Sequence, residues 1–315
     1  RRRVEMKLVF CGTPQFAVPT LQRLTASGFD VQLVVTQPDS PQGRGMELAA
    51  PPVKQAAQKL NLPVVQPERI KNNEGFQKQL AALAPEAIIV VGYGRIIPPW
   101  MLALPPRGNI NVHASLLPKY RGAAPIQWAI ANGESFTGVT TMLLNEGLDT
   151  GDILLQTETP ILPEDTSVTL SPRLAELGAA LLVETLQGLE RGEIHPVPQD
   201  HARASLAPIL KKEDGQVDFR RDAAGIHNRL RGFQPWPGAY THFRGKNLKI
   251  IAARPAEGVS NLSQGELRID GEKLLAGCGR GTVLELLQVQ PEGKKVISAR
   301  EFVSGYRLGA SERLG

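Results

Sequence analysis

Residues 6–36, MKLVFCGTPQFAVPTLQRLTASGFDVQLVVT, decide the fold class. The run MKLVFCG at 6–12 is typical of a buried strand that stops at Gly12. Apolar residues then recur at helical spacing between positions 16 and 24, which predicts a helix that ends at Gly28. A second strand is expected at 31–36, so the stretch predicts a strand-helix-strand unit of an α/β protein.

The alternation of strand and helix continues through the first half of the chain. Helical patterns cover 53–60 and 74–83, and strand patterns cover 63–65, 87–91, 110–113 and 138–144. This order predicts a Rossmann-like domain with a mostly parallel sheet and helices on both faces. The first turn, GTPQFA at 12–17, lacks the glycine spacing that lets a pyrophosphate approach the backbone closely, so we expect no NAD.

A stretch without periodicity at 192–207 predicts a linker between two domains. We therefore expect a catalytic domain at 6–191 and a second domain at 208–315. Short strand-like segments separated by turn residues favour a smaller β-barrel, similar to an oligonucleotide-binding (OB) barrel, in the second domain. These segments are 217–219, 239–243, 248–251, 265–269, 273–276, 283–287 and the tail 296–303.

The net charge of +5 is distributed unevenly. Residues 1–207 carry 18 Lys and Arg against 19 Asp and Glu, whereas residues 208–315 carry 18 against 12, which gives −1 and +6. A basic second domain indicates contact with a polyanion, although a solvated surface of the same charge remains an alternative.

Several classes of protein are disfavoured by composition. No apolar run approaches the roughly 20 residues that cross a membrane, so we expect a cytoplasmic protein. Cys11 and Cys278 are too few and too far apart for a disulfide framework or a thiolate metal site, and we expect buried thiols. His195, His201, His227 and His242 have no ligand-spaced partners, so no metal is predicted and all four are interpreted as non-catalytic.

Polar residues concentrate at 109–125, NINVHASLLPKYRGAAP. Strand alternation places Asn111 and His113 on one face, and the turn at 145–152, NEGLDTGD, offers carboxylates beside the same crevice. An amide and an imidazole could stabilise the oxyanion formed when an amine attacks a formyl carbon, and a neighbouring Asp would orient the imidazole. On spacing alone, the commoner role of Asn and His near a strand end, that of hydrogen-bonding loop residues, is favoured over a catalytic role.

These motifs resemble the signature of the formyltetrahydrofolate-dependent formyltransferases. The resemblance rests on Asn111-Val112-His113-x-Ser115-Leu116-Leu117-Pro118, Arg121-Gly122 and Gly147-Leu148-Asp149-Thr150-Gly151-Asp152. Further strings, at 10–17, 36–39, 43–45, 121–127, 228–239 and 290–295, resemble the branch of this family that formylates methionyl-tRNA. The likeness extends from about residue 6 to residue 308.

The resemblance implies an enzyme of translation initiation that transfers the formyl group of 10-formyltetrahydrofolate to the α-amino group of initiator methionyl-tRNA. It implies that Asn111, His113 and Asp149 form a catalytic triad and that a reduced folate binds at Ser115, Leu116, Leu117, Pro118, Tyr93, Gly94 and Ile96. Contacts to tRNA are implied for Arg44, Lys294 and Lys295, with no metal, and we expect a monomer.

One departure and two alternatives accompany this resemblance. Many relatives carry two basic residues after Gly43-Arg44-Gly45, where this chain has Met46 and Glu47, which predicts weaker phosphate contacts in that loop. The first alternative is a folate-dependent enzyme that acts on a small molecule, and the basic second domain disfavours it. The second is a nucleic-acid-binding protein with a silent first domain, which the intact Asn111, His113 and Asp149 disfavour.

Overall fold

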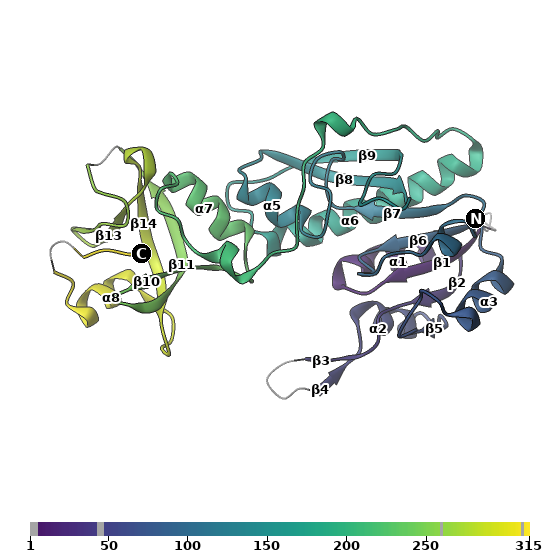
Figure 1. The fold of residues 1–315 in the computed structure, drawn as a ribbon, viewed down its shortest axis with the longest axis horizontal. Helices are drawn as coiled ribbons and strands as arrows, with labels where there is room; N and C mark the ends of the chain where they lie inside the picture. The colour runs from purple at the N-terminus through teal and green to yellow at the C-terminus, as the bar shows by residue number, and fades with distance from the viewer. Residues whose placement is uncertain (1–5, 43–46, 259–260, 310–311) are drawn as a thin grey trace. The chain divides into compact units, whose positions relative to one another are not determined.

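The computed structural model describes residues 6–42, 47–258, 261–309 and 312–315 and divides into two compact units (Figure 1). Unit 1 consists of the residues up to Pro125, Phe136–Pro160 and Ser171–Ala207, and unit 2 consists of Ile126–Ser135, Ile161–Leu170 and Pro208–Gly315. Unit 2 thus includes two short segments from the middle of the chain as well as its C-terminal third. The domain boundaries expected from the sequence, at 191 and 207, stay predictions.

Unit 1 is built on a seven-stranded sheet with the order β5-β2-β1-β6-β7-β8-β9. The first five strands in this order are parallel to one another. Strand β8 pairs antiparallel with both β7 and β9, so the prediction of a mostly parallel sheet is confirmed. The strands are β1 (Lys7–Gly12), β2 (Asp30–Val35), β5 (Val64–Val65), β6 (Ala87–Val91), β7 (Asn109–His113), β8 (Phe136–Leu143) and β9 (Ile153–Pro160). A separate hairpin pairs β3 (Ser40–Gln42) with β4 (Glu47–Ala49).

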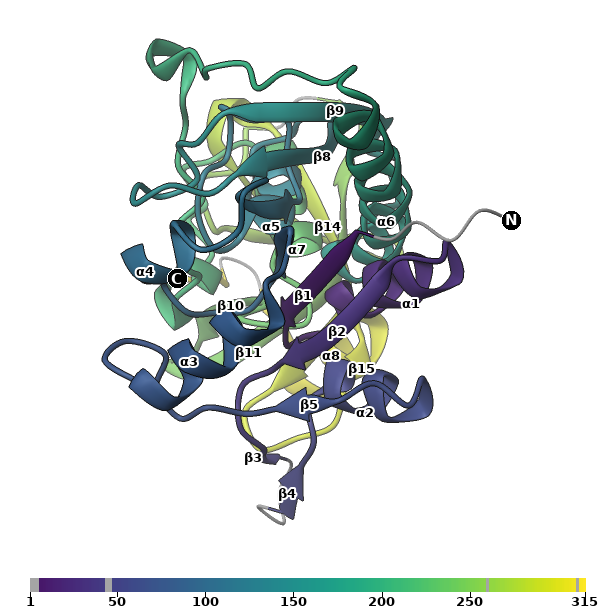
Figure 2. The same ribbon diagram turned by 90° about the vertical axis from the view of Figure 1, so that its right-hand side faces the viewer.

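Helices cover both faces of this sheet, and the central strands are therefore almost continuously apolar (Figure 2). One face packs against α3 (Glu74–Leu83) and α4 (Pro99–Leu102), whose Phe76, Leu80 and Met101 join the strand residues in one core cluster. The other face lies against α1 (Val18–Ala26), α2 (Pro52–Lys59) and the part of α6 (Ser167–Arg191) that belongs to unit 1. No helix in the described part of the chain combines the length and the apolar character that a membrane crossing needs.

Strand β9 was not expected from the sequence. From Leu155 onward its residues alternate between buried or half-buried and exposed positions, because β9 is the edge strand of the sheet and β8 is its one neighbouring strand in the order. The sequence itself does not alternate, because three apolar residues are followed by the four polar residues 156–159, and this gave a weak strand signal beside the turn residues 145–152.

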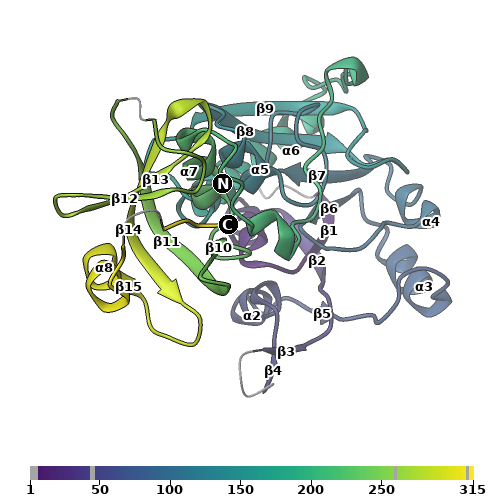
Figure 3. The ribbon, with the colours of Figure 1, turned by 60° about the vertical axis from the view of Figure 1, so that its left-hand side comes forward.

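Unit 2 is built on a six-stranded antiparallel sheet (Figure 3). The order is β10-β11-β14-β13-β12, with β15 paired to β14. Residues 312–315 link the two edge strands, because Leu267 N–H donates to Glu312 O at 2.8 Å and Gly315 N–H donates to His242 O at 3.0 Å. The sheet thereby closes on itself, as expected for a small barrel. The strands are β10 (Ala239–Phe243), β11 (Lys246–Ala256), β12 (Leu267–Asp270), β13 (Lys273–Gly277), β14 (Val283–Pro291) and β15 (Ile297–Ser298).

Two of the strand expectations in unit 2 are wrong. The tail 296–303 contains only the two residues of β15 and then forms helix α8 (Ala299–Tyr306). Ser298 and Glu301 form a reciprocal capping box, which fixes the helix start, and their spacing was a readable signal. Residues 217–219 form no strand, and only the neighbouring Gln216 bridges to Tyr240.

Helix α7 (Ala223–Gly232) packs on β11 and holds His227, whose Nδ1 donates to the carbonyl of Ala253 at 3.0 Å. Burial, followed by the charge of Arg231, lowers the pKa of His227 in the folded protein. The unfolded chain then binds a proton more readily than the folded one, so unit 2 should lose stability as the pH falls through the unfolded-state pKa.

We therefore expect the free energy of unfolding to fall more steeply between pH 8 and pH 5 in the parent than in His227→Asn. Asparagine can keep a donor near the Ala253 carbonyl, whereas its side chain does not titrate. Urea unfolding at several pH values measures the difference. Parallel curves for the two proteins would show that His227 does not contribute to the pH dependence.

Candidate active site

Two polar side chains lie on one face of β7. Its Val112 packs against α6, where a Cβ on Gly178 would approach Val112 Cγ1 to 2.7 Å. The flanking Asn111 and His113 therefore face the opposite side, as the alternation predicts. They are only 9% and 6% exposed, and no hydrogen bond to the side chain of Asn111 is found among the described residues.

The imidazole of His113 is fixed by its two ring nitrogens. Its Nε2 lies 2.9 Å from the carbonyl oxygen of Tyr120, and because a carbonyl only accepts, Nε2 carries a proton. Its Nδ1 lies 3.8 Å from Oδ2 of Asp149. In the neutral ring, Nδ1 is therefore the nitrogen with a free lone pair, and it faces a carboxylate.

Asp149 reaches His113 by an unexpected route. Because β8 is antiparallel to β7, the turn after β8 starts near Asn109, where Leu144 N–H donates to the Asn109 carbonyl at 2.7 Å. The turn then folds back along β7 to place Asp149 beside His113. The backbone of Asp149 has a φ of +50°, a conformation that costs a non-glycine residue about 1–3 kcal/mol.

The carboxylate of Asp149 has a second partner, the N–H of Gly122, which donates to Oδ2 at 2.8 Å. Its side chain is 14% exposed. A charged oxygen that accepts a backbone N–H in a largely buried position is held in one orientation. The loops that follow β7 and β8 thus meet at this carboxylate.

The turn Ser115–Pro118 is held by polar groups from β8 and β9. Thr140 Oγ1 donates to Ser115 O at 2.6 Å and accepts from Leu117 N–H at 3.1 Å. Gln156 Nε2 donates to Leu117 O at 2.9 Å. The side chains of Ser115 and Leu117 are buried, so the turn exposes mainly Leu116, Pro118 and backbone.

Residues 93–96 follow β6, the parallel neighbour of β7, so this loop begins at the same edge of the sheet as the 114–118 turn. Gln37 Nε2 donates to the carbonyls of Tyr93 at 3.0 Å and Gly94 at 3.3 Å. Tyr93 is buried, and burial raises the pKa of its phenol to about 12. Ile96 is 90% exposed, which leaves an apolar side chain uncovered beside this edge.

Two buried residues beside Asp149 were not assigned to the site from the sequence, although Arg121 lies in one of the quoted motifs. Arg121, 7% exposed, donates two hydrogen bonds to Gln199, and Gln199, 6% exposed, donates to the backbone around Asp149. His201 Nδ1 accepts a hydrogen bond from Arg121 at 3.0 Å, so His201, expected in the linker, lies beside the same buried side chain. A Gln in an aperiodic stretch gives no sequence signal for such a role.

The residues expected to contact tRNA are not part of this cluster. Lys294 and Lys295 are exposed in the turn between β14 and β15 of unit 2, and Arg44 lies outside the described residues. Cys11 and Cys278 are both free and buried, as expected, and burial raises the pKa of both thiols. Across the part of the chain that the structure describes, no group of three His, Cys, Asp or Glu side chains is arranged to hold a metal.

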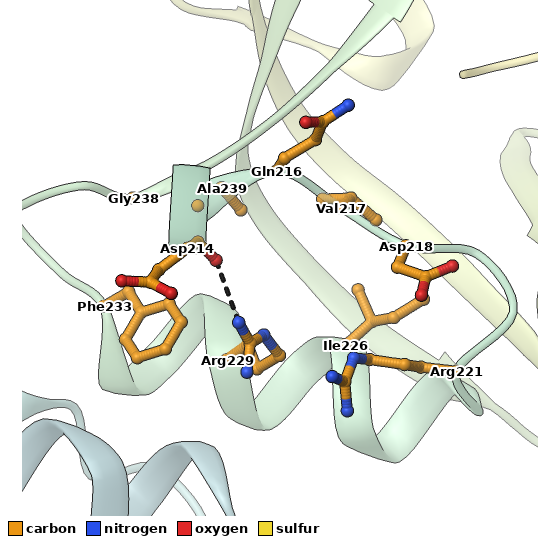
Figure 4. A pocket seen from close by; sticks show the side chains of 11 residues that line it. Asp214, Gln216, Val217, Asp218, Arg221, Ile226, Arg229, Phe233, Gly238 and Ala239 are labelled. Carbon is orange, nitrogen blue, oxygen red and sulfur yellow. Dashed lines mark hydrogen bonds between the residues drawn. The ribbon is translucent and has the colours of Figure 1, made fainter. Parts of the chain in front are cut away.

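Unit 2 has a small cavity of its own beside α7, lined by Asp214, Ile226, Arg229 and Phe233 among others (Figure 4). The guanidinium of Arg229 donates to the Asp214 carbonyl at 3.1 Å. It also lies 5.5 Å from the ring centroid of Trp128 and 4.7 Å from that of Phe233. These contacts join α7 to the 126–135 segment, so we interpret the cavity as part of the packing of unit 2.

Comparisons with known proteins agree with this architecture. The formyl transferase family model matches residues 6–186, and the model of the formyl transferase C-terminal domain matches residues 209–307. A crystal structure described as the N-formyltransferase from Helicobacter canadensis in complex with folinic acid and dTDP-3-aminofucose is 19% identical, with a TM-score of 0.66 over 91% of this chain and 99% of that one. At that identity the likeness concerns the fold.

Two curated relatives are much more similar. The methionyl-tRNA formyltransferase of Koribacter versatilis is 67% identical over 98% of this chain and 99% of its own length. That of Acidobacterium capsulatum is 60% identical over 98% of this chain and 100% of its own length. Because such identity extends through both units, this chain belongs to the methionyl-tRNA formyltransferase family.

Proposed function

We propose that this chain transfers the formyl group of 10-formyltetrahydrofolate to the α-amino group of initiator methionyl-tRNA, a step of translation initiation. The observation that carries the proposal is the arrangement of His113 Nδ1, the Asp149 carboxylate and the Gly122 N–H at the end of β7. The family membership supports the same donor and acceptor. Asn111, His113 and Asp149 are the proposed catalytic residues.

His113 handles the proton in this proposal. An amine attacks only in its unprotonated form and must lose a further proton after the new C–N bond has formed. With Nε2–H committed to the Tyr120 carbonyl, Nδ1 is the nitrogen that can accept this proton. Asp149, 3.8 Å away, then stabilises the positive charge on the ring. The protonated ring gives this proton to the donor nitrogen as the bond between that nitrogen and the formyl carbon breaks, which returns His113 to its neutral form.

Asn111 stabilises negative charge. Its side chain lies on the same strand face as His113, and its amide has no hydrogen-bond partner among the described residues. A preorganised amide N–H directed at the formyl oxygen lowers the barrier as charge develops there, and removal of one such donor typically costs about 10²–10³-fold in kcat.

The donor-binding residues in this proposal are Ser115–Pro118 with Tyr93, Gly94 and Ile96. The two loops follow neighbouring parallel strands, and a ligand commonly binds at that edge of an α/β sheet. The exposed Ile96 and the rigid backbone of the 115–118 turn fit a ligand with a flat ring and polar edges. The donor supplies the formyl carbon, and these residues hold it in position.

Unit 2 supplies the contact with tRNA. Residues 208–315 carry a net charge of +6, and the exposed Lys294 and Lys295 contribute to it, with Arg44 as a further contact from the first half of the chain. We also propose that the enzyme acts as a monomer in the cytoplasm, where charged initiator tRNA is used. A small acceptor would not need this charge.

Formylation assays with different acceptors test the function directly. Purified protein with 10-formyltetrahydrofolate should formylate charged initiator tRNA and leave free methionine unmodified. A nucleotide-linked amino sugar and glycinamide ribonucleotide serve as the alternative acceptors. Faster formylation of either small molecule than of methionyl-tRNA would assign this chain a different acceptor.

The basic charge of unit 2 makes a quantitative prediction about salt. Affinity for methionyl-tRNA should fall steeply as KCl rises, because phosphate contacts release counterions, whereas affinity for folate should change little. Lys294→Ala with Lys295→Ala should reduce the slope of log Kd against log salt by roughly one unit per lost phosphate contact. Filter binding at four or more salt concentrations measures this slope.

The matched control is Lys71→Ala with Lys78→Ala, which removes the same charge from exposed positions in unit 1. This control should leave the slope close to that of the parent. If both double variants change the slope equally, the effect comes from net charge, and Lys294 and Lys295 are not contacts.

A further inference from the structure

The stretch 196–207 is bound to the active-site loops along its length. Val197 and Ile153 exchange two backbone hydrogen bonds, of 2.8 and 2.9 Å. Further along, Ser205 O accepts from Arg121 N–H at 2.8 Å, and Ala207 N–H donates to Arg121 O at 2.7 Å. A segment that resembles a connector by its sequence therefore forms one wall of the loops that hold His113 and Asp149.

Gln199 is a buried residue of this segment, and both the nitrogen and the oxygen of its side-chain amide form hydrogen bonds. Nε2 donates to the carbonyl of Asp149 at 2.9 Å and to that of Gly151 at 2.7 Å. Oε1 accepts from Nε and Nη2 of Arg121 at 3.1 and 2.7 Å. Because a guanidinium only donates and a carbonyl only accepts, this arrangement fixes which way the amide points.

We propose that Gln199 is a positioning residue for Asp149, an inference that rests on the proposed function of the triad. Its two hydrogen bonds, to the carbonyls of Asp149 and Gly151, hold the backbone at and directly after Asp149, whose positive φ a non-glycine residue rarely adopts. The carboxylate then stays in reach of both the Gly122 N–H and His113 Nδ1. Arg121 acts one step further away by orienting the amide.

Two substitutions at Gln199 separate the donor role from the acceptor role. Gln199→Leu keeps the approximate size and loses every hydrogen bond, whereas Gln199→Glu keeps two acceptors for Arg121 and loses both donors. If the donors hold Asp149, both variants should lower kcat by about 10-fold or more, because small misplacements of a catalytic group slow the chemical step. The KM for each substrate should change by no more than about threefold.

A double variant distinguishes positioning from a general structural role. In Asp149→Asn the carboxylate charge is already absent, so Gln199→Leu should add less than about a threefold further loss of kcat. A residue that merely supports the fold would lower kcat by the same factor in both backgrounds. His195→Ala, directly before this stretch, is the control, since His195 is exposed, and it should have the parent kcat.

Each outcome decides a different point. A normal kcat in Gln199→Glu, or multiplicative losses in the double variant, would overturn the positioning role and leave the triad intact. A normal kcat in Asp149→Asn would remove Asp149 from the proposed mechanism and overturn this inference with it, whereas failure of the parent protein to formylate methionyl-tRNA would overturn the proposed function itself. Thermal unfolding of every variant is measured in parallel, and Gln199→Glu provides the decisive comparison if Gln199→Leu does not fold.

Discussion

Replacement of His113 by alanine is expected to lower kcat for formyl transfer by on the order of 10²–10⁴-fold, the usual contribution of a positioned acid-base group. No other described group takes the place of Nδ1, which alone combines a free lone pair with a carboxylate 3.8 Å away. Asp149→Asn should lose about 10²-fold, because the amide can still accept the Gly122 N–H but carries no charge. Affinity for methionyl-tRNA, measured by filter binding, should remain close to that of the parent.

Asparagine is suited to this test at position 149. It adopts positive φ more readily than most residues, so the turn at φ +50° should keep its shape. His195→Gln, in an exposed position, controls for loss of a histidine elsewhere. Near-normal turnover in His113→Ala or in Asp149→Asn would remove the substituted residue from the proposed mechanism.

Gly122→Ala should impair both stability and rate. Gly122 has a φ of +120°, and an added Cβ would lie 2.6 Å from the carbonyl oxygen of Ala207. The backbone must then shift, and the Gly122 N–H that binds Asp149 shifts with it. We expect kcat to fall by about 10²-fold, and strain of roughly 2–3 kcal/mol to lower Tm by about 4–12 °C in a protein of this size.

Gly192→Ala is the matched control for the backbone conformation. Gly192 also has a positive φ, of +70°, but nothing lies within 4 Å of its added Cβ. The free energy of unfolding of Gly192→Ala should therefore fall only by the cost of the left-handed backbone conformation, about 1–2 kcal/mol, and its kcat should be unchanged. Equal kcat values for the two variants would mean that the close contact with Ala207 does not position the site.

Much of unit 1 could be predicted because local patterns and packing agree there. Buried parallel strands have apolar runs that are easy to recognise, and the alternation from Ile110 to His113 correctly placed two polar residues on one face. The turn around Asp149 was recognised by its composition. Its return along β7 was not expected, because it depends on the antiparallel direction of β8, which no local pattern specifies.

Other features could not be predicted because they depend on contacts between distant residues. Gln199 is identified as part of the site only by hydrogen bonds to residues about 50 and 78 positions earlier in the sequence. The closure of the unit 2 sheet depends on residues 312–315, which are too short and irregular to predict as a strand. The exposed, polar edge strand β9 illustrates the same limit.

Unit 2 is assembled from three separate segments of the chain, and this restricts which segments can be exchanged with a related protein during evolution or engineering. The chain passes between the units after residues 125, 135, 160, 170 and 207, and Phe233, directly after α7, packs against Trp128 of the first inserted segment. A recombination event that joins a foreign C-terminal third at residue 208 would therefore bring mismatched partners for 126–135 and 161–170. Successful chimaeras should need those two segments from the same parent as the C-terminal third.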